Sequence, residues 1–169
     1  MFAGDWLLGE VVLAALIAAA LLATVLVVLL KFRSRSVLRP ESAPGLWQRD
    51  ELFEYARSAG LHIREHGRPG ELPPPVDITA YRILQESLTN VIEHAVQPSV
   101  VDVRFDRHGR MFELVVRDDG KGASTARMGD GLRAMDAQAT ALGGRVDVQT
   151  TSAGGYQVRA LLPVSRPKA

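Results

Sequence analysis

The chain has 169 residues, a formal net charge of +1 and no cysteine. This length is enough for one soluble domain of ordinary size together with an appendage. The nearly neutral charge does not indicate a nucleic-acid-binding surface, so no nucleic-acid partner is expected. The lack of thiols excludes disulfides, thiolate metal sites and thiol catalysis.

An apolar run lies close to the N-terminus. Residues 11–30 read VVLAALIAAALLATVLVVLL, with Thr24 as the one polar residue. A helix of about 20 apolar residues spans a bilayer core of about 30 Å. Acidic residues precede the run and basic residues follow it, which is the reverse of the order in a cleaved signal peptide. The sequence therefore predicts a retained single-pass anchor over residues 1–33 in the cell membrane, with the C-terminal domain in the cytoplasm.

The segment after this anchor predicts the domain boundaries. Residues 34–45 contain two prolines and show no apolar periodicity, so they are interpreted as a linker. The folded domain is expected over residues 46–165, followed by a tail over residues 166–169. Within the domain, residues 46–59 have helical spacing and residues 61–66 alternate like a strand. A proline-rich turn, GELPPPVD, is expected next.

The central predicted helix covers residues 79–95. One face is apolar, with Tyr81, Leu84, Leu88, Val91 and Ala95 at helical spacing. A second face carries Glu86, Asn90 and His94, each one turn after the last. A carboxylate and a carboxamide one turn apart can share a hydrated Mg²⁺ ion, which prefers oxygen ligands. The alternative is a surface helix whose polar face is only solvated.

Two alternating strands, residues 100–106 and 111–118, predict an antiparallel hairpin with a tight connection that contains Gly109. Asp118 has the same parity as the apolar residues of its strand, so its carboxylate should point under the sheet. Burying such a group without a hydrogen-bond partner is costly. The alternative is that Asp118 forms an Asx turn before Gly120.

The remaining elements complete an α+β fold. A glycine-rich loop covers residues 120–131, and helical spacing resumes over residues 132–142. Two final strands are expected at residues 146–150 and 156–162. Because helices and strands do not alternate regularly, we expect a two-layer arrangement with the helices on one face of a mixed sheet.

Four motifs stand in order along this domain: QESLTNVIEHA, DDGKG, GDGL and GGYQVRALLP. Together they resemble the ATP-binding domain of histidine kinases, particularly the nitrate-sensor type, within the GHKL ATPase superfamily. The resemblance covers residues 47–163. It implies the Bergerat ATP-binding fold, a two-layer α/β sandwich, with ATP and Mg²⁺ as cofactors.

The resemblance also implies roles for individual residues. Asn90 would hold the magnesium ion, and Glu86 would act near the phosphates as the catalytic residue. Asp118 would accept a hydrogen bond from the adenine amine. The other positions matched to nucleotide binding are His94, Gly120, Lys121, Gly122, Gly129, Gly131 and Leu132.

The sequence departs from the family pattern at several positions. Glu93 stands where the family usually has Lys, so its charge should repel the phosphates across a shared mouth with Glu86. Tyr156 replaces a Thr close to the adenine-binding Asp, and residues 123–128 form a short ATP lid. A linker takes the place of the helix that carries the phosphoacceptor histidine. The four histidines, none in an ELHD-like context, are His62, His66, His94 and His108.

These features favour a membrane-anchored ATP-binding module of a two-component signalling system, with phosphotransfer only to a histidine supplied by another chain. Its expected partners are ATP, the membrane, and a histidine kinase or response regulator. A non-catalytic protein that keeps the fold to bind or sequester a kinase is the first alternative. An anti-sigma-type serine kinase is the second.

Overall fold

The computed structural model describes residues 43–121 and 129–164. Within these residues, the strands form one mixed sheet. Its strand order is β1-β2-β3-β5-β4, with β1 parallel to β2 and every other pair antiparallel. The strands are β1 (His62–His66), β2 (Val100–His108), β3 (Met111–Asp118), β4 (Arg145–Thr150) and β5 (Tyr156–Pro163).

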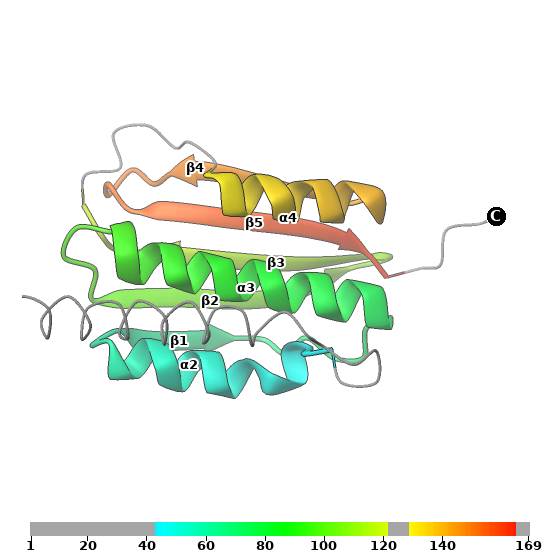
Figure 1. Ribbon diagram of the computed structural model, residues 1–169, viewed down its shortest axis with the longest axis horizontal. Helices are drawn as coiled ribbons and strands as arrows, with labels where there is room; N and C mark the ends of the chain where they lie inside the picture. The colour runs from blue at the N-terminus through cyan, green and yellow to red at the C-terminus, as the bar shows by residue number, and fades with distance from the viewer. Residues whose placement is uncertain (1–42, 122–128, 165–169) are drawn as a thin grey trace, which may run out of the picture. The chain divides into compact units, whose positions relative to one another are not determined.

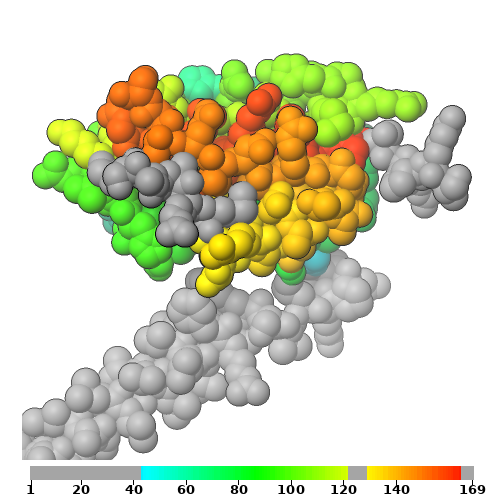
Figure 2. Space-filling view, turned by 90° about the horizontal axis from the view of Figure 1, so that it is seen from above, coloured from blue at the N-terminus to red at the C-terminus, as the bar shows by residue number. Residues whose placement is uncertain are grey.

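The helices lie on one face of this sheet (Figure 1). They are the 3₁₀ turn η1 (Leu46–Gln48), α2 (Arg49–Ser58), α3 (Pro74–His94) and α4 (Asp130–Ala141). The central helix α3 runs along the middle of the sheet and contacts β3 and β5 (Figure 1). Helix α4 packs next to β4 (Figure 2). The predicted α+β architecture, with helices on one face of a mixed sheet, is therefore confirmed.

Alternation along the strands explains how the two faces differ. In β3, Phe112, Leu114 and Val116 are all at most 2% exposed and pack under the helices. Each such side chain contributes about 1.5–3 kcal/mol when it is fully buried. The intervening residues of β3 point to the opposite, open face of the sheet. This parity determines which side chains of β3 can reach the helices.

The helix α3 begins earlier than the sequence predicts. The proline-rich turn was expected to precede a helix starting at residue 79, but α3 starts at Pro74. Proline is tolerated in a first helical turn because the N–H groups there have no acceptor within the helix. The apolar face is confirmed, since Tyr81, Leu84, Leu88 and Val91 are buried. Ala95 lies just past the last residue of the helix.

The junction at the start of the domain is fixed to the first turn of α3. The backbone N–H of Leu46 donates to Asp77 Oδ1 at 3.0 Å, and the Leu46 side chain is buried. A Cβ atom on Gly45 would lie 1.9 Å from Asp77 Oδ2, so a larger residue there would displace the Asp77 carboxylate. The entering chain and α3 are thus joined at one point.

Two other boundaries differ from the prediction. Strand β2 extends to His108, so the connection to β3 is only Gly109 and Arg110. Gly109 has a φ of +60°, which is suited to a tight two-residue turn. Helix α4 begins at Asp130 rather than at residue 132.

No helix within the two described stretches, 43–121 and 129–164, is long and apolar enough to cross a membrane. The anchor predicted over residues 1–33 lies outside these stretches, as does most of the predicted linker.

Candidate functional site

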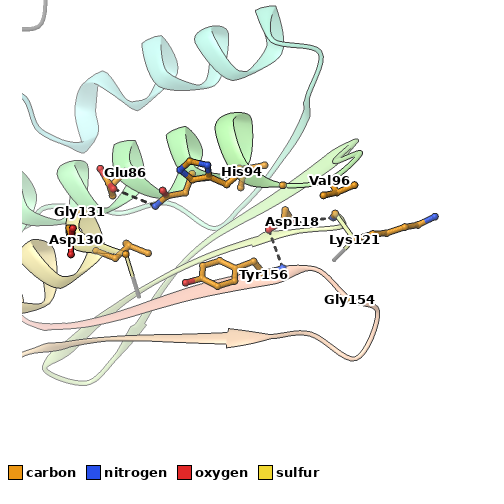
Figure 3. A pocket seen from close by; sticks show the side chains of 15 residues that line it. Glu86, His94, Val96, Asp118, Lys121, Asp130, Gly131, Gly154 and Tyr156 are labelled. Carbon is orange, nitrogen blue, oxygen red and sulfur yellow. Dashed lines mark hydrogen bonds between the residues drawn. The ribbon is translucent and has the colours of Figure 1, made fainter. Parts of the chain in front are cut away.

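A cavity of about 390 Å³ lies between α3, the ends of β3 and β5, and the N-terminus of α4 (Figure 3). Every predicted site residue that the structure describes lines this cavity: Glu86, Asn90, His94, Asp118, Gly120, Lys121, Gly129, Gly131 and Leu132. Gly122 lies outside the described residues. Residues from three separate motifs thus meet at one place.

Asp118 forms the buried end of the cavity. It is 3% exposed, and its parity on β3 points it under the sheet as predicted. Its Oδ1 accepts a hydrogen bond from Gly120 N–H at 2.8 Å, and its Oδ2 accepts one from Tyr156 N–H at 3.1 Å. The bond to Gly120 is the alternative Asx turn, so both interpretations hold together. Because each carboxylate oxygen has two lone pairs, Asp118 retains acceptor capacity for a donor on a ligand.

Close backbone approach at Gly155 makes this arrangement possible. A Cβ atom there would lie 2.1 Å from the backbone oxygen of Asp118. The strand end at Tyr156 can therefore come near enough for its N–H to reach the Asp118 carboxylate. Glycine at this position is required by the fold of the site.

Glu86 and Asn90 lie one turn apart on α3, and both line the cavity. Glu86 is on the side of the cavity across from Tyr156 (Figure 3). Both α3 side chains are half-buried, and Asn90 Nδ2 donates to Glu86 Oε1 at 3.5 Å. A hydrogen bond of this length is weak, so either side chain can turn toward a ligand at little cost. The amide and carboxylate oxygens are the donor types that Mg²⁺ prefers, so the pair fits this ion.

The N-terminus of α4 closes the cavity on a third side. Gly129 is its N-cap and supplies no side-chain hydrogen bond to the first turn. The first N–H groups of a helix have no acceptor within it, and the helix dipole favours negative charge there. Gly131 is close to Glu86, because a Cβ atom on Gly131 would lie 1.8 Å from Glu86 Oε1. This end of the cavity fits a phosphate group.

Lys121 lines the cavity through its backbone. Its N–H donates to the Val96 carbonyl at 2.9 Å, and the two residues form an isolated antiparallel bridge. The Lys121 side chain extends away from Glu86 and Tyr156 (Figure 3). The sequence pattern did not indicate this bridge, which joins the segments after α3 and β3.

The aromatic ring of Tyr156 lines the cavity between the end that contains Asp118 and the end that contains Glu86 (Figure 3). The side chain is half-buried, and burial raises the pKa of the Tyr156 hydroxyl. The ring provides an apolar surface beside the Asp118 carboxylate. A planar base fits between such a ring and the apolar side chains of α3.

Asp119 is a structural residue that the sequence analysis did not single out. Its carboxylate accepts the N–H groups of Ser99 and Val100, at 2.7 and 2.9 Å, and the Ser99 hydroxyl. Burial raises the pKa of Asp119, but these hydrogen bonds outweigh it and lower the pKa to about 2. The DDG doublet therefore has two functions: Asp118 faces the cavity, and Asp119 fixes the start of β2.

The expectation that Glu93 shares the cavity mouth with Glu86 is corrected by the structure. Glu93 is not among the residues that line the cavity, and its side chain is 58% exposed. Its carboxylate lies 3.9 Å from Nε2 of His94. Three residues after Asn90, the helix has turned this position toward solvent.

The fold and this cavity together define a class of ATPase domain. Residues 76–166 match the family described as "Histidine kinase-, DNA gyrase B-, and HSP90-like ATPase". The chain belongs to this family, and its domain is the histidine kinase-like type. The resemblance to the ATP-binding domain of histidine kinases, inferred from the four motifs, is confirmed, while the nitrate-sensor subtype stays a prediction.

Relatives and solved structures agree with this assignment. "Sensor histidine kinase YxjM" of Bacillus subtilis (strain 168) is 32% identical over 130 residues, which are 75% of this chain and 32% of that protein. DegS of Brevibacillus brevis, named a signal transduction histidine-protein kinase/phosphatase, is 26% identical over 72% of this chain and 32% of its own length. The chain thus spans about a third of these two relatives.

The fold also resembles a solved structure. The histidine kinase domain of the blue-light activated histidine kinase EL346 from Erythrobacter litoralis superposes with a TM-score of 0.55 at 19% identity. This match covers 67% of the present chain and 59% of that one. The similarity supports the fold.

Proposed function

We propose that this chain is a membrane-anchored ATP-binding module of a two-component signalling system, and that it binds Mg²⁺-ATP in the cavity around Asp118. The observation that carries the proposal is the meeting of three elements at one cavity: a buried carboxylate, an Asn–Glu pair and a helix N-terminus. In this proposal they contact, in that order, the base, the metal-bound phosphates and the terminal phosphate of ATP.

Each residue has a defined part in this proposal. Asp118 accepts an N–H from the base and orients it, while the amides at the start of α4 stabilise negative charge on the phosphates. Asn90 and Glu86 would hold Mg²⁺, which neutralises phosphate charge when it is bound. Glu86 is also placed to accept a proton from the attacking group. That group is a histidine of another chain.

A direct test is Mg²⁺-dependent binding of a fluorescent ATP analogue to the full chain, purified in detergent. We expect saturable binding that unlabelled ATP displaces and that EDTA weakens strongly. A signal that does not saturate, or that ATP does not displace, would overturn the proposal.

The alternative of a non-catalytic interaction protein is favoured by one observation, the Tyr156 ring inside the cavity. If the ring fills the space for the base, the full chain will not bind the analogue. Tyr156→Thr, which restores the residue type usual in the family, would then create binding. If the wild-type chain binds ATP, the Tyr156 ring no longer favours this alternative.

Gly131→Ala is expected to weaken Mg²⁺-ATP binding about five- to tenfold without unfolding the domain. The new Cβ atom would displace the Glu86 carboxylate, which is the end of a flexible side chain, so the fold tolerates the change. Alanine is also the better helix former. The loss corresponds to about 1–1.4 kcal/mol of binding free energy.

Adenosine binding provides the matched comparison for Gly131→Ala. Because adenosine has no phosphates, its affinity should stay unchanged in this variant. Thr140→Ala serves as the control, because Thr140 is an exposed residue of α4 that does not line the cavity. Equal losses for adenosine and ATP would contradict a role for Gly131 at the phosphates.

Glu93→Lys should change ATP affinity about twofold or less. The exposed position of Glu93 lets water and salt screen its charge from the cavity. Titration of both variants at two salt concentrations measures the effect. A gain of fivefold or more that shrinks as salt is raised would restore the original expectation of a shared mouth.

We also propose that residues 1–33 anchor the chain in the cell membrane, with the ATP-binding domain in the cytoplasm. The support is the apolar run over residues 11–30 and the basic residues that follow it. Reporter fusions at the C-terminus test this topology. A cytoplasmic reporter should be active there, and an active periplasmic reporter would refute the orientation.

A further inference from the structure

The open face of the sheet, opposite the helices, holds a buried carboxylate that the ATPase site does not use. Glu113 on β3 is 2% exposed although it points away from the helices. Its Oε1 accepts a hydrogen bond from Arg159 Nε. Its Oε2 lies 3.1 Å from His108 Nε2 and 3.4 Å from Arg104 Nη2.

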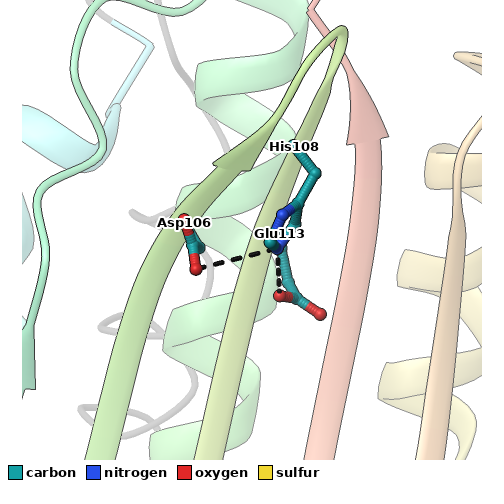
Figure 4. Close-up of side chains that lie close together, drawn as sticks. All are labelled: Asp106, His108 and Glu113. Atoms are coloured by element: carbon teal, nitrogen blue, oxygen red, sulfur yellow. Dashed lines mark hydrogen bonds and ion pairs between the residues drawn. The ribbon is translucent and has the colours of Figure 1, made fainter.

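Glu113 belongs to a three-residue cluster on the β2–β3 hairpin (Figure 4). Asp106 and His108 are two residues apart on β2 and therefore share its open face. Glu113 is paired directly opposite Asp106 in the strand register. One potential ligand atom from each of the three residues lies within 4.8 Å of the others. A paired sheet is a rigid support for such a triangle.

The separations within the triangle suit a metal ion with short bonds. His108 Nε2 lies 3.1 Å from Glu113 Oε2 and 3.7 Å from Asp106 Oδ2. Tetrahedral coordination with bonds of about 2.0–2.1 Å places neighbouring ligand atoms about 3.3 Å apart. Small rotations of the two exposed side chains bring the cluster to this geometry.

We propose that Asp106, His108 and Glu113 form a binding site for a first-row divalent metal ion, with Zn²⁺ as the best match. Imidazole nitrogen and carboxylate oxygen are both ligand types that this class of ion accepts, whereas Mg²⁺ and Ca²⁺ prefer oxygen ligands alone. His108 and Glu113 also line a polar hollow of about 690 Å³ on this face. A water molecule can therefore supply the fourth ligand.

The two arginines beside Glu113 have different effects on this site. Arg159 binds only Oε1, so it fixes the carboxylate and leaves Oε2 for the metal. Arg104 lies near Oε2 and competes with the metal, but its side chain is 53% exposed and can move into solvent.

The site is separate from the proposed nucleotide cavity. Asp118 is the last residue of β3 and faces the helices, whereas Glu113 lies near the first residue of β3 and faces away from them. Metal bound here would join β2 to β3 near their turn without contacting ATP. Failure of one proposal therefore leaves the other intact.

The experiment titrates the full chain, purified in detergent and treated with a chelator, with Zn²⁺ in competition with a chromophoric chelator. We expect one Zn²⁺ site per chain that is tighter than any other. Co²⁺ at this site should show the intense visible bands of tetrahedral coordination. His108→Asn should weaken Zn²⁺ binding at least about tenfold, because it removes the nitrogen ligand.

Two further variants make the test specific. Arg104→Gln should tighten Zn²⁺ binding about three- to tenfold, because it removes a competing positive charge. His66→Asn is the matched control: His66 also has a carboxylate partner, Asp102 at 3.1 Å, but does not belong to the cluster, so binding should change less than twofold. Asp106→Asn provides a second ligand deletion if His108→Asn fails to fold.

The opposite results would overturn the proposal. These are equal effects of His66→Asn and His108→Asn, no tightening in Arg104→Gln, or Co²⁺ spectra typical of six water ligands. Any of them would mean that the cluster is an ion-pair network that stabilises the hairpin without a metal.

Discussion

Asp118→Asn is expected to weaken ATP binding about ten- to a hundredfold, which corresponds to about 1.5–3 kcal/mol. The carboxylate accepts hydrogen bonds only, whereas the amide can present an N–H toward the donor on the base. The same amide nitrogen would face the N–H of either Gly120 or Tyr156, which now donate to Asp118. Titration with the fluorescent ATP analogue measures the loss of affinity.

Two comparisons separate the ligand contact of Asp118 from its structural contacts. Asp147→Asn, an exposed substitution on β4, is the control and should leave ATP affinity unchanged. Thermal unfolding of Asp118→Asn should show a modest loss of stability, of about 1–3 kcal/mol. ATP affinity equal to that of the wild type would mean that Asp118 serves the turn alone.

Gly155→Ala should destabilise the domain by about 1–3 kcal/mol and also abolish most ATP binding. Its Cβ atom would lie 2.1 Å from the backbone oxygen of Asp118, and a backbone atom cannot move aside as a side chain can. Gly155 also accepts a hydrogen bond from Thr151 N–H at 2.8 Å, so the turn before β5 would shift with it. Urea unfolding measures the change in the free energy of unfolding.

Gly129→Ala provides the matched control, because it adds a methyl group in the same cavity at a point where no atom of the described residues lies within 4 Å. The unfolding temperature of Gly155→Ala should fall by about 4–8 °C for each kcal/mol lost. If Gly155→Ala and Gly129→Ala unfold at the same temperature, the close approach of β3 and β5 does not constrain the site.

The burial of Asp118 could be predicted from the sequence because sheet parity is strict. Phe112, Leu114 and Val116 fix which face of β3 is covered, and every second residue must follow them. The stacking of Glu86 and Asn90 could be predicted for a similar reason, since helical periodicity places residues four apart on one face. Local periodicity therefore determines most of the side-chain directions in the cavity.

The start of α3 could not be predicted by the same reasoning. Three consecutive prolines usually indicate a turn, yet Pro74 and Pro75 occupy the first helical turn, where their missing N–H groups cost nothing. Glu93 was misplaced for a different reason. Helical periodicity predicts the direction in which the Glu93 side chain points. It does not predict how far along α3 the cavity extends, because that depends on where the neighbouring elements end.

The cluster on the open face was missed because one strand boundary was wrong. His108 was expected in the hairpin turn, where it would have no fixed relation to Asp106. The structure places it in β2, two residues after Asp106 and on the same face. The two-residue turn, Gly109 and Arg110, sets the register between β2 and β3. The length of this turn therefore determines which side chains of β2 lie next to Glu113.

With the hydrogen bond between Asp77 and Leu46, the two ends of the domain's central helix are connected to different features. One end holds the chain as it enters the domain, and Glu86 lies nine residues further along, about 13 Å away. A helix transmits a displacement along its axis because its backbone hydrogen bonds resist compression and twist. The position of the Glu86–Asn90 pair is therefore tied, through one continuous helix, to the point where the described domain begins.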